Sequence, residues 1–168
     1  MERKGWMGIG VSNTYVKILR SLEIFNFGFD SFLIVIADEI NEKYNSREKG
    51  QLPKDLYNLA KKISFRKLSV QYWNYFSSKV KYKFFLEEYR NLFINNEEFR
   101  KDVLKLVKWN RKMKEIKDSE GYVLEELASI SYMAEKGFVK VGVKSKEEVF
   151  DNLAKKYPLV KNLVFEYF

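Results

Sequence analysis

One apolar segment, Phe32–Ala37, constrains the fold more than any other part of the sequence. It runs FLIVIA without a polar residue and ends at Asp38. A strand with apolar side chains on both faces has to be covered on both faces, which is typical of a parallel sheet packed between helices. The run is far too short to span a membrane, so it predicts a buried strand.

Further strand signals are spread along the chain. Trp6–Ile9 is a short apolar run, and Leu68–Trp73 carries β-branched and aromatic residues. Phe138–Val143 alternates apolar and polar residues, and a final strand is expected over about Val160–Phe168, after Pro158. Together with Phe32–Ala37, these segments predict about five strands.

Helical spacing and capping residues predict helices between the strands. Ser12, Pro53 and Ser145 mark the starts of three helices. Three further helical stretches are expected over about 79–93, 96–116 and 119–136. Gly137 is expected to end the last of these as a C-cap.

The alternation of strands and helices favours right-handed crossovers and a parallel sheet. We therefore predict an α/β fold, a Rossmann-like parallel sheet of about five strands flanked by helices. The length of 168 residues and the scarcity of Gly and Pro predict a single domain over residues 1–168. Ligands of such sheets bind outside the carboxyl ends of the strands, so the residues that follow those ends are candidates for a site.

Composition narrows the possible chemistry. The chain has no His and no Cys, which excludes a Ser-His-Asp triad, thiol chemistry, disulfides and the usual zinc sites. The net charge of +8 predicts a polyanionic partner, either nucleic acid or an anionic membrane. The first residues lack the pattern of a signal peptide, so we expect a cytoplasmic protein. The richness in Lys and Glu resembles the composition of a thermophile's protein.

A turn containing two glycines follows the first predicted strand. Gly8 and Gly10 would let a ligand approach the backbone closely, and the helix that starts at Ser12 and Asn13 offers N–H groups at its positive end. The same residues equally suit an ordinary strand–turn–helix, in which the glycines only permit the turn. Because position 13 is Asn, the dinucleotide fingerprint GxGxxG is absent and no NAD site is proposed.

A tyrosine and a glutamate are spaced to share one helix face. Tyr122 and Glu126 are four residues apart, whereas Leu127 and Ile130 lie on a different, apolar side. A phenol beside a carboxylate can bind an ammonium group, or relay a proton if burial raises the pKa of the carboxyl group. By spacing alone, a solvated Tyr/Glu pair on an amphipathic helix is the favoured interpretation, because Glu is a common residue on helix surfaces.

A basic stretch without acidic residues runs from Leu56 to Leu86. Cations neutralise phosphates, and exposed aromatic rings can stack on unpaired bases. A solvated charged face with its aromatic residues in the core is the alternative interpretation. The cations are Lys61, Lys62, Arg66, Lys67, Lys79, Lys81 and Lys83, interleaved with Tyr72, Trp73, Tyr75 and Phe76.

In this order the segments resemble the tRNA-dependent cyclodipeptide synthases, a family similar to the catalytic domain of class I aminoacyl-tRNA synthetases. The family's glycine–aliphatic–serine–any–glycine–asparagine–serine–aromatic loop is matched at Gly8, Ile9, Asn13 and Tyr15. The segment from Tyr122 to Glu126 matches the family's tyrosine/glutamate motif. The resemblance extends over nearly the whole chain, and it implies the same Rossmann-like fold.

The resemblance implies aminoacyl-tRNA as the partner and aminoacyl transfer as the reaction. In the family, a serine accepts the amino acid, a second aminoacyl-tRNA yields a dipeptidyl enzyme, and cyclisation releases a diketopiperazine. Neither ATP nor a metal takes part, so we expect no cofactor and no metal. No membrane partner is expected, and the chain is expected to be a monomer or a homodimer.

The resemblance also implies roles for individual residues. Tyr122 and Glu126 would hold the amino group of the substrate and assist proton transfer. The family's nucleophilic serine falls at Gly10, so Ser12 is the candidate substitute, and the place of a late-strand tyrosine falls near Gly142. Gly8, Gly10, Asn13 and Tyr15 would line the substrate pocket, and the tRNA contacts would be Lys54, Lys61, Lys62, Arg66 and Lys67.

Two other functions remain open. The glycine at position 10 is compatible with a catalytically inert homologue that binds tRNA without turnover. A structural or small-molecule protein that shares only the fold is the second alternative.

Overall fold

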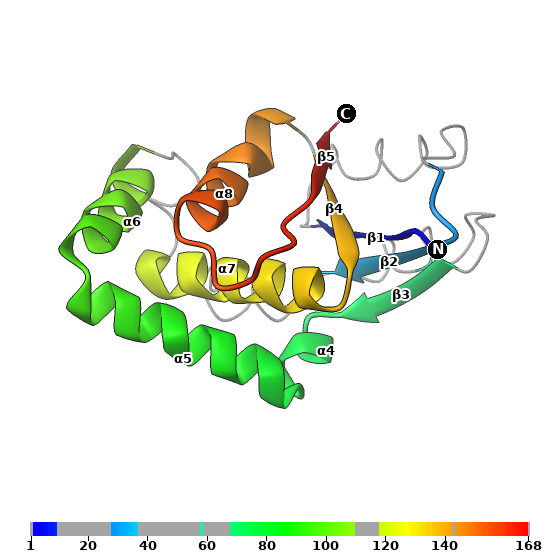
Figure 1. Cartoon of the computed structure of the whole chain (residues 1–168), viewed down its shortest axis with the longest axis horizontal. Coiled ribbons are helices and arrows are strands. Elements are labelled where there is room, and N and C mark those ends of the chain that lie inside the picture. Colours follow the sequence, from blue (N-terminus) through cyan, green and yellow to red (C-terminus); the bar gives the residue numbers. More distant parts are fainter. Residues whose placement is uncertain are drawn as a thin grey trace.

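The computed structural model describes residues 2–9, 28–36, 58, 68–109, 118–142 and 144–167. Five strands of these segments form one parallel sheet in the order β3-β2-β1-β4-β5, with β1 at its centre (Figure 1). The predicted α/β class with about five parallel strands is therefore confirmed. The strands are β1 (Lys4–Ile9), β2 (Ser31–Ile36), β3 (Leu68–Tyr72), β4 (Phe138–Gly142) and β5 (Phe165–Tyr167).

The described helices follow the third strand and alternate with the last two. The helices predicted over 79–93 and 119–136 are confirmed as α5 and α7, and Gly137 follows α7 with a positive φ of 81°. The helix predicted over 96–116 is confirmed as α6 up to Trp109, and residues 110–116 lie outside the described residues. The helices predicted after Ser12 and Pro53 lie outside the described residues. The helices are α4 (Asn74–Ser77), α5 (Val80–Asn95), α6 (Glu97–Trp109), α7 (Ser119–Glu135) and α8 (Lys144–Lys156).

The last strand and the last helix do not start where they were predicted. The described strand is only Phe165–Tyr167, whereas it was predicted from about Val160. Val160 and Leu163 lie in the connecting segment before it and pack against the hydrophobic core. The last helix begins at Lys144, one residue before the predicted cap at Ser145.

Side chains alternate between the two faces of the sheet. Trp6 and its register partner Leu33 face the helices and join the main core cluster. The Trp6 ring lies 5.8 Å from the ring of Phe76 on α4. On the other face, Gly5 allows close packing, since a Cβ there would lie 2.8 Å from the ring of Phe32.

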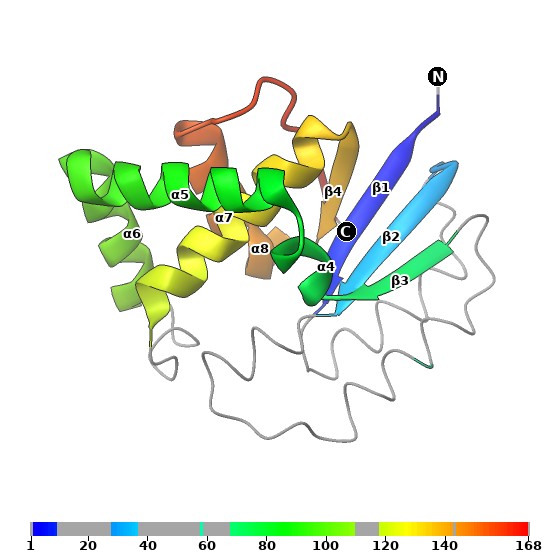
Figure 2. The same ribbon diagram turned by 90° about the horizontal axis from the view of Figure 1, so that it is seen from below.

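Helix α7 lies at the centre of the helical layer and contacts α5, α6, α8 and β4 (Figure 2). Every residue from Leu127 to Ala134 is buried, as expected of a helix that is enclosed on all sides. The buried hydroxyl of Tyr89 on α5 lies 2.9 Å from that of Ser131 on α7. Burial raises the pKa of Tyr89 to about 12, so this phenol stays neutral and holds the two helices together.

A buried ion pair joins α8 to the sheet. The Nζ of Lys140 on β4 donates to the Oδ1 of Asp151 on α8 at 2.6 Å, and these side chains are only 6% and 1% exposed. The hydroxyl of Tyr167 on β5 donates to the other carboxylate oxygen at 2.7 Å. One carboxylate therefore connects two strands and a helix.

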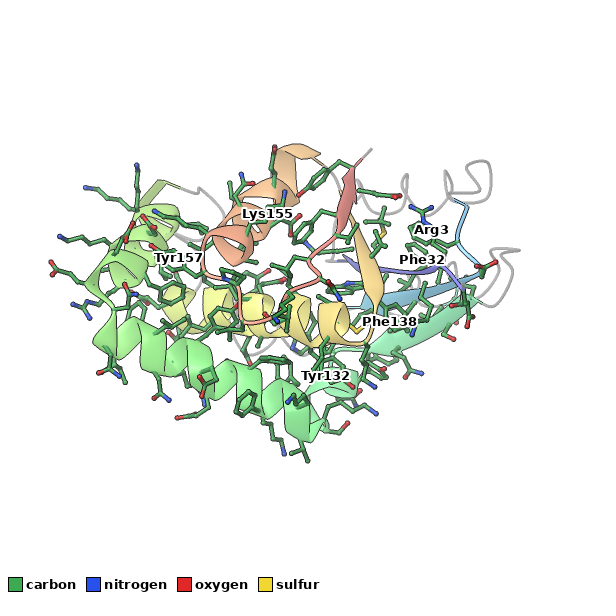
Figure 3. The ribbon with its side chains drawn as sticks, in the orientation of Figure 1. Arg3, Phe32, Tyr132, Phe138, Lys155 and Tyr157 are labelled. Carbon is green, nitrogen blue, oxygen red and sulfur yellow. The ribbon has the colours of Figure 1, made fainter. Side chains whose placement is uncertain are left out.

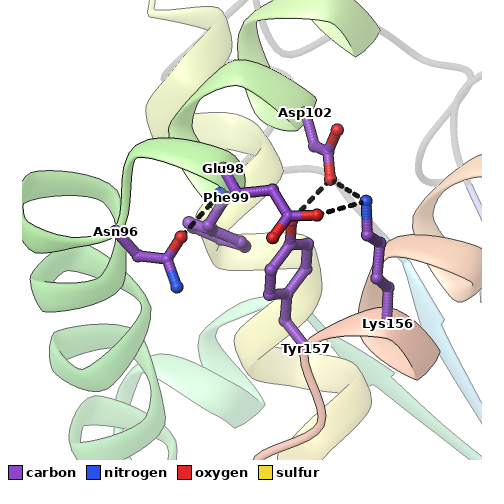
Figure 4. A network of polar contacts seen from close by, with 6 residues as sticks. All are labelled: Asn96, Glu98, Phe99, Asp102, Lys156 and Tyr157. Atoms are coloured by element: carbon purple, nitrogen blue, oxygen red, sulfur yellow. Dashed lines mark hydrogen bonds and ion pairs between the residues drawn. The ribbon is translucent and has the colours of Figure 1, made fainter.

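A second polar cluster joins α6 to the end of α8 (Figure 4). Lys156 contacts Asp102 at 2.7 Å and Glu98 at 3.1 Å, and the hydroxyl of Tyr157 donates to Asp102 at 2.6 Å. The Tyr157 ring packs edge-on against Phe99, with 4.9 Å between the ring centroids. Hydrogen bonds from Lys156 and then Tyr157 are the main causes that lower the pKa of Asp102.

Replacing Asp151 with Ala tests the buried ion pair. The variant leaves the buried Lys140 ammonium without this carboxylate, so we expect the free energy of unfolding to fall by about 3–5 kcal/mol in urea denaturation. The double variant Lys140→Met, Asp151→Leu should recover most of this loss, because apolar residues need no ion partner. As a control, Glu98→Gln removes an exposed ion pair and should change little. If Asp151→Ala were as stable as the wild type, the ion pair between Lys140 and Asp151 would not stabilise the fold.

Acid titration tests the cluster around Asp102. Because the folded state lowers the pKa of this carboxyl group, its contribution to stability is present above the ordinary value of about 3.9 and is lost as the pH falls through the lower folded-state value. The stability difference between the wild type and Asp102→Asn should therefore be largest near neutral pH and vanish at strongly acidic pH. A difference that does not depend on pH would contradict this assignment.

Candidate functional site

The candidate tyrosine and glutamate lie on the N-terminal half of α7. The helix is capped by Asp118, whose Oδ1 accepts a hydrogen bond from the N–H of Gly121 at 3.0 Å. Tyr122 and Glu126 are half-buried, whereas Leu127 and Ile130 are fully buried. Both side chains of the pair are therefore partly exposed, although Tyr122 also packs against the hydrophobic core.

The ring of Tyr122 is positioned by α8. It packs edge-on against Phe150, with 6.1 Å between ring centroids and an interplanar angle of 68°. Phe150 is next to Asp151 in the chain, so the buried ion pair that attaches α8 to the sheet also sets the position of this ring. The phenol is consequently held by packing and is not a freely moving surface group.

Gly8 lies at the carboxyl end of the central strand. Its register partner on β2 is Val35, which belongs to the helix-facing core, and Trp6 on the same face lies beneath the helices. Among the described residues, a Cβ at Gly8 would meet only a Trp6 ring carbon, at 3.8 Å. Unlike Gly5, Gly8 is therefore not required by the packing of the described part of the sheet.

The topology brings Gly8 and the N-terminal half of α7 to the same edge. α7 is followed directly by β4 and runs antiparallel to it, so the N-terminus of α7 lies toward the carboxyl ends of the strands. Glu126 lies about 9 Å closer to that edge than Tyr132, measured along the helix. Gly8 lies about 7 Å closer to it than Trp6, measured along the strand. Both groups of residues lie on the helix-covered face, at the edge where ligands of parallel sheets bind.

The other predicted site residues lie outside the described residues. These are Gly10, Ser12, Asn13, Tyr15, Lys54, Lys61, Lys62, Arg66 and Lys67. Their roles stay predictions.

The structure adds one tyrosine that the sequence patterns did not indicate. Gly142 at the end of β4 pairs with Tyr167 of β5, whose hydroxyl is bound to Asp151. A phenol thus lies beside the place where the family's late-strand tyrosine falls. No local signal could locate it, because a strand of three residues has no periodicity that fixes its register.

The described residues contain no cluster of three or more Asp or Glu residues that could hold a metal ion. None of the described helices is both long and apolar enough to cross a bilayer. A hollow of about 550 Å³ is lined by Lys155 at the end of α8, which is labelled in Figure 3, and by part of the segment that connects α8 to β5. None of the predicted site residues is among its described lining residues.

Comparisons with known proteins address the fold. No protein-family model matches the sequence, and the curated proteins provide no match either. A CDPS from Staphylococcus haemolyticus superposes with a TM-score of 0.70 at 18% identity, covering 98% of this chain and 89% of that one. For AlbC, a cyclodipeptide synthase from Streptomyces noursei, the TM-score is 0.65 at 12% identity, with 100% and 96% covered.

The chain has the cyclodipeptide synthase fold. The same fold occurs in a tyrosyl-tRNA synthetase from Archaeoglobus fulgidus, which matches with a TM-score of 0.65 at 11% identity. That match covers 99% of this chain but 54% of the synthetase, so the cyclodipeptide synthase fold corresponds to about half of the larger enzyme. The resemblance to both groups is thereby confirmed as a likeness of fold.

Two glycine substitutions test the packing at Gly5 and Gly8. Gly5→Ala should lower the free energy of unfolding by about 1–3 kcal/mol, because its Cβ would overlap the Phe32 ring. Gly8→Ala should stay within about 0.5 kcal/mol of the wild type, since only an ordinary contact forms. Thermal and urea denaturation measure both. A Gly8→Ala variant that is destabilised as strongly as Gly5→Ala would show that Gly8 serves packing.

Proposed function

We propose that this chain transfers aminoacyl groups from aminoacyl-tRNA and forms a cyclic dipeptide or a related peptide-bond product. The observation that carries the proposal is a topology that brings the N-terminal half of α7, which holds Tyr122 and Glu126, to the edge of the sheet where Gly8 lies, within a fold shared with cyclodipeptide synthases. The synthetase neighbour from Archaeoglobus fulgidus was solved with L-tyrosine, so this fold can accommodate an amino acid. The net charge of +8 supports a tRNA partner.

Glu126 and Tyr122 would bind the α-ammonium group of the aminoacyl moiety. A carboxylate accepts strong charge-assisted hydrogen bonds from an ammonium, and a phenol oxygen offers a further acceptor. When the amine becomes the nucleophile, Glu126 would take up its proton. Gly8, Gly10, Asn13 and Tyr15 would line the pocket, and Lys54, Lys61, Lys62, Arg66 and Lys67 would contact the tRNA.

Two routes are compatible with Gly10. In the first, Ser12 takes the place of the family's serine and accepts the aminoacyl group as an ester. In the second, the amine of one aminoacyl-tRNA attacks the ester carbonyl carbon of another directly. The C–N bond then forms as the ester C–O bond breaks, and the ribose oxygen leaves with the proton that the amine loses. Aminoacyl esters are already activated, so positioning alone can promote this second route.

A binding function without turnover is the second candidate, and the glycine at position 10 favours it. Such a protein would hold charged or uncharged tRNA with an affinity that falls steeply with salt. It would release no peptide product.

Substitutions at Glu126 and Tyr122 test the transfer function. Incubation with aminoacyl-tRNAs, followed by mass spectrometry of small products, should show a wild-type product that Glu126→Gln reduces about 100-fold. Tyr122→Phe keeps the ring that packs on Phe150 and should cost about 10-fold. Glu120→Gln makes the same charge change on the same helix and should retain activity.

The wild-type result separates the candidate functions. Amino-acid release no faster than spontaneous ester hydrolysis would rule out transfer, whatever the variants do. Salt-sensitive tRNA binding without product would then support the binding function. Loss of activity in Glu120→Gln to the same extent as in Glu126→Gln would contradict the assigned role of Glu126.

A further inference from the structure

A group of lysines and aromatic rings lies where α4 and α5 begin and where α7 ends. We call it the α4–α5 patch. It is distinct from the predicted tRNA contacts, which lie outside the described residues. Its members are Tyr75, Lys79, Lys81, Lys83, Phe84 and Lys136.

Cation–ring contacts connect one side of the patch. The Nζ of Lys79 lies 4.8 Å from the ring centroid of Tyr75, and that of Lys136 lies 5.2 Å from the ring centroid of Tyr132. Tyr132 is labelled in Figure 3 at the end of α7 that faces α5. Hydrogen bonding to Tyr132 raises the pKa of Lys136, so this lysine stays charged. These contacts hold two ammonium groups over aromatic faces.

Lys81 connects the other side. Its Nζ lies 4.8 Å from the ring centroid of Phe84 and 3.5 Å from a carboxylate oxygen of Glu135, the residue before Lys136. Lys81 and Glu135 therefore join the start of α5 to the end of α7. Glu135 is the acidic residue that the structure pairs with it, against four lysines.

The structure separates the aromatic residues of the basic stretch into two groups. Trp73 is 4% exposed and Phe76 is fully buried, so both serve the core. Phe84 is 50% exposed and Tyr75 is half-buried. The core interpretation therefore holds for Trp73 and Phe76, whereas Tyr75 and Phe84 leave ring surface exposed.

The lysines are placed where they do not help the helix. The N-terminal turn of a helix carries the positive end of its dipole and is stabilised by acidic residues. The first turn of α5 has no acidic residue and carries Lys79, Lys81 and Lys83 instead. The next acidic residue along the helix, Glu87, pairs with Arg90 at 3.3 Å. Helix stability therefore gives no reason for these cations, whereas a polyanionic ligand does.

From this arrangement we infer that the α4–α5 patch binds an unpaired segment of RNA. The lysines would neutralise its phosphates, and Phe84 and Tyr75 would stack on its bases. An exposed ring next to cations suits single strands better than duplex, whose bases present no free face. The identification of this RNA as part of a tRNA rests on the proposed function.

Fluorescence anisotropy with three RNAs tests the inference: bulk tRNA, a single-stranded oligouridylate of about 12 nucleotides and an RNA duplex. The double variant Lys81→Gln, Lys83→Gln should weaken binding to the single strand at least 10-fold and lower the slope against log salt by about 1.4. The matched control Lys101→Gln, Lys105→Gln on α6 removes the same charge and should leave the affinity nearly unchanged.

A second pair of variants tests stacking. Phe84→Leu keeps an apolar side chain but loses the ring, and it should weaken the single-stranded complex about 5-fold or more while sparing the duplex. Leu104→Ala at another exposed apolar position on α6 is the control. Phe84 is half exposed, so its replacement should not disturb the core. Circular dichroism should confirm that Phe84→Leu folds like the wild type.

The outcomes separate this inference from the proposed function. Equal losses in the α5 variant and the α6 control would overturn the patch as an RNA site, even if tRNA binds and transfer occurs. Equal effects of Phe84→Leu on the single strand and the duplex would overturn the preference for unpaired bases. Binding of the oligouridylate through the patch, without any aminoacyl transfer, would uphold the inference while the proposed transfer fails.

Discussion

The enclosure of α7 governs the rest of the described structure. The sheet, α5, α6 and α8 all pack on this one helix, so its position fixes the spacing between the layers. Every residue from Leu127 to Ala134 is buried, and the half-buried polar residues of the helix lie in its first turns. A central helix whose polar end reaches the carboxyl edge of the sheet can present Tyr122 and Glu126 rigidly. Rigid placement is what the recognition of a small ammonium group needs.

Charged groups have two different uses in this chain. Lys140 and Asp151 are buried against each other and, through α8, determine where Phe150 supports Tyr122. Such a pair adds little net stability, because the cost of desolvating the two ions offsets their attraction. Its main effect is to fix the position of α8 on the sheet. The lysines of the α4–α5 patch are exposed and lie at the unfavourable end of a helix dipole. Their positions are better explained by a ligand than by the fold.

Much of the fold could be predicted from the sequence, because local patterns determine it. The FLIVIA run became β2, a strand of which nearly every residue is buried, and the periodic segments became α5, α6 and α7. The last strand was predicted to start too early, because Val160 and Leu163 are buried against the core from a connecting segment and not from a strand. A residue pattern shows that a side chain needs burial, but it does not show which partner will bury it.

The candidate site, too, could be predicted only in part from the sequence. The sequence by itself determined the α/β class, the absence of histidine and cysteine chemistry, and the helical spacing that sets Tyr122 above Glu126. Only the tertiary structure decided that β1 is central, that Gly8 and the start of α7 share an edge, and that Tyr167 lies opposite Gly142. It also decided that Phe84 is a surface residue while Phe76 is core. The reason is physical: strand order, register and burial depend on contacts between segments far apart in the chain, which local periodicity does not encode.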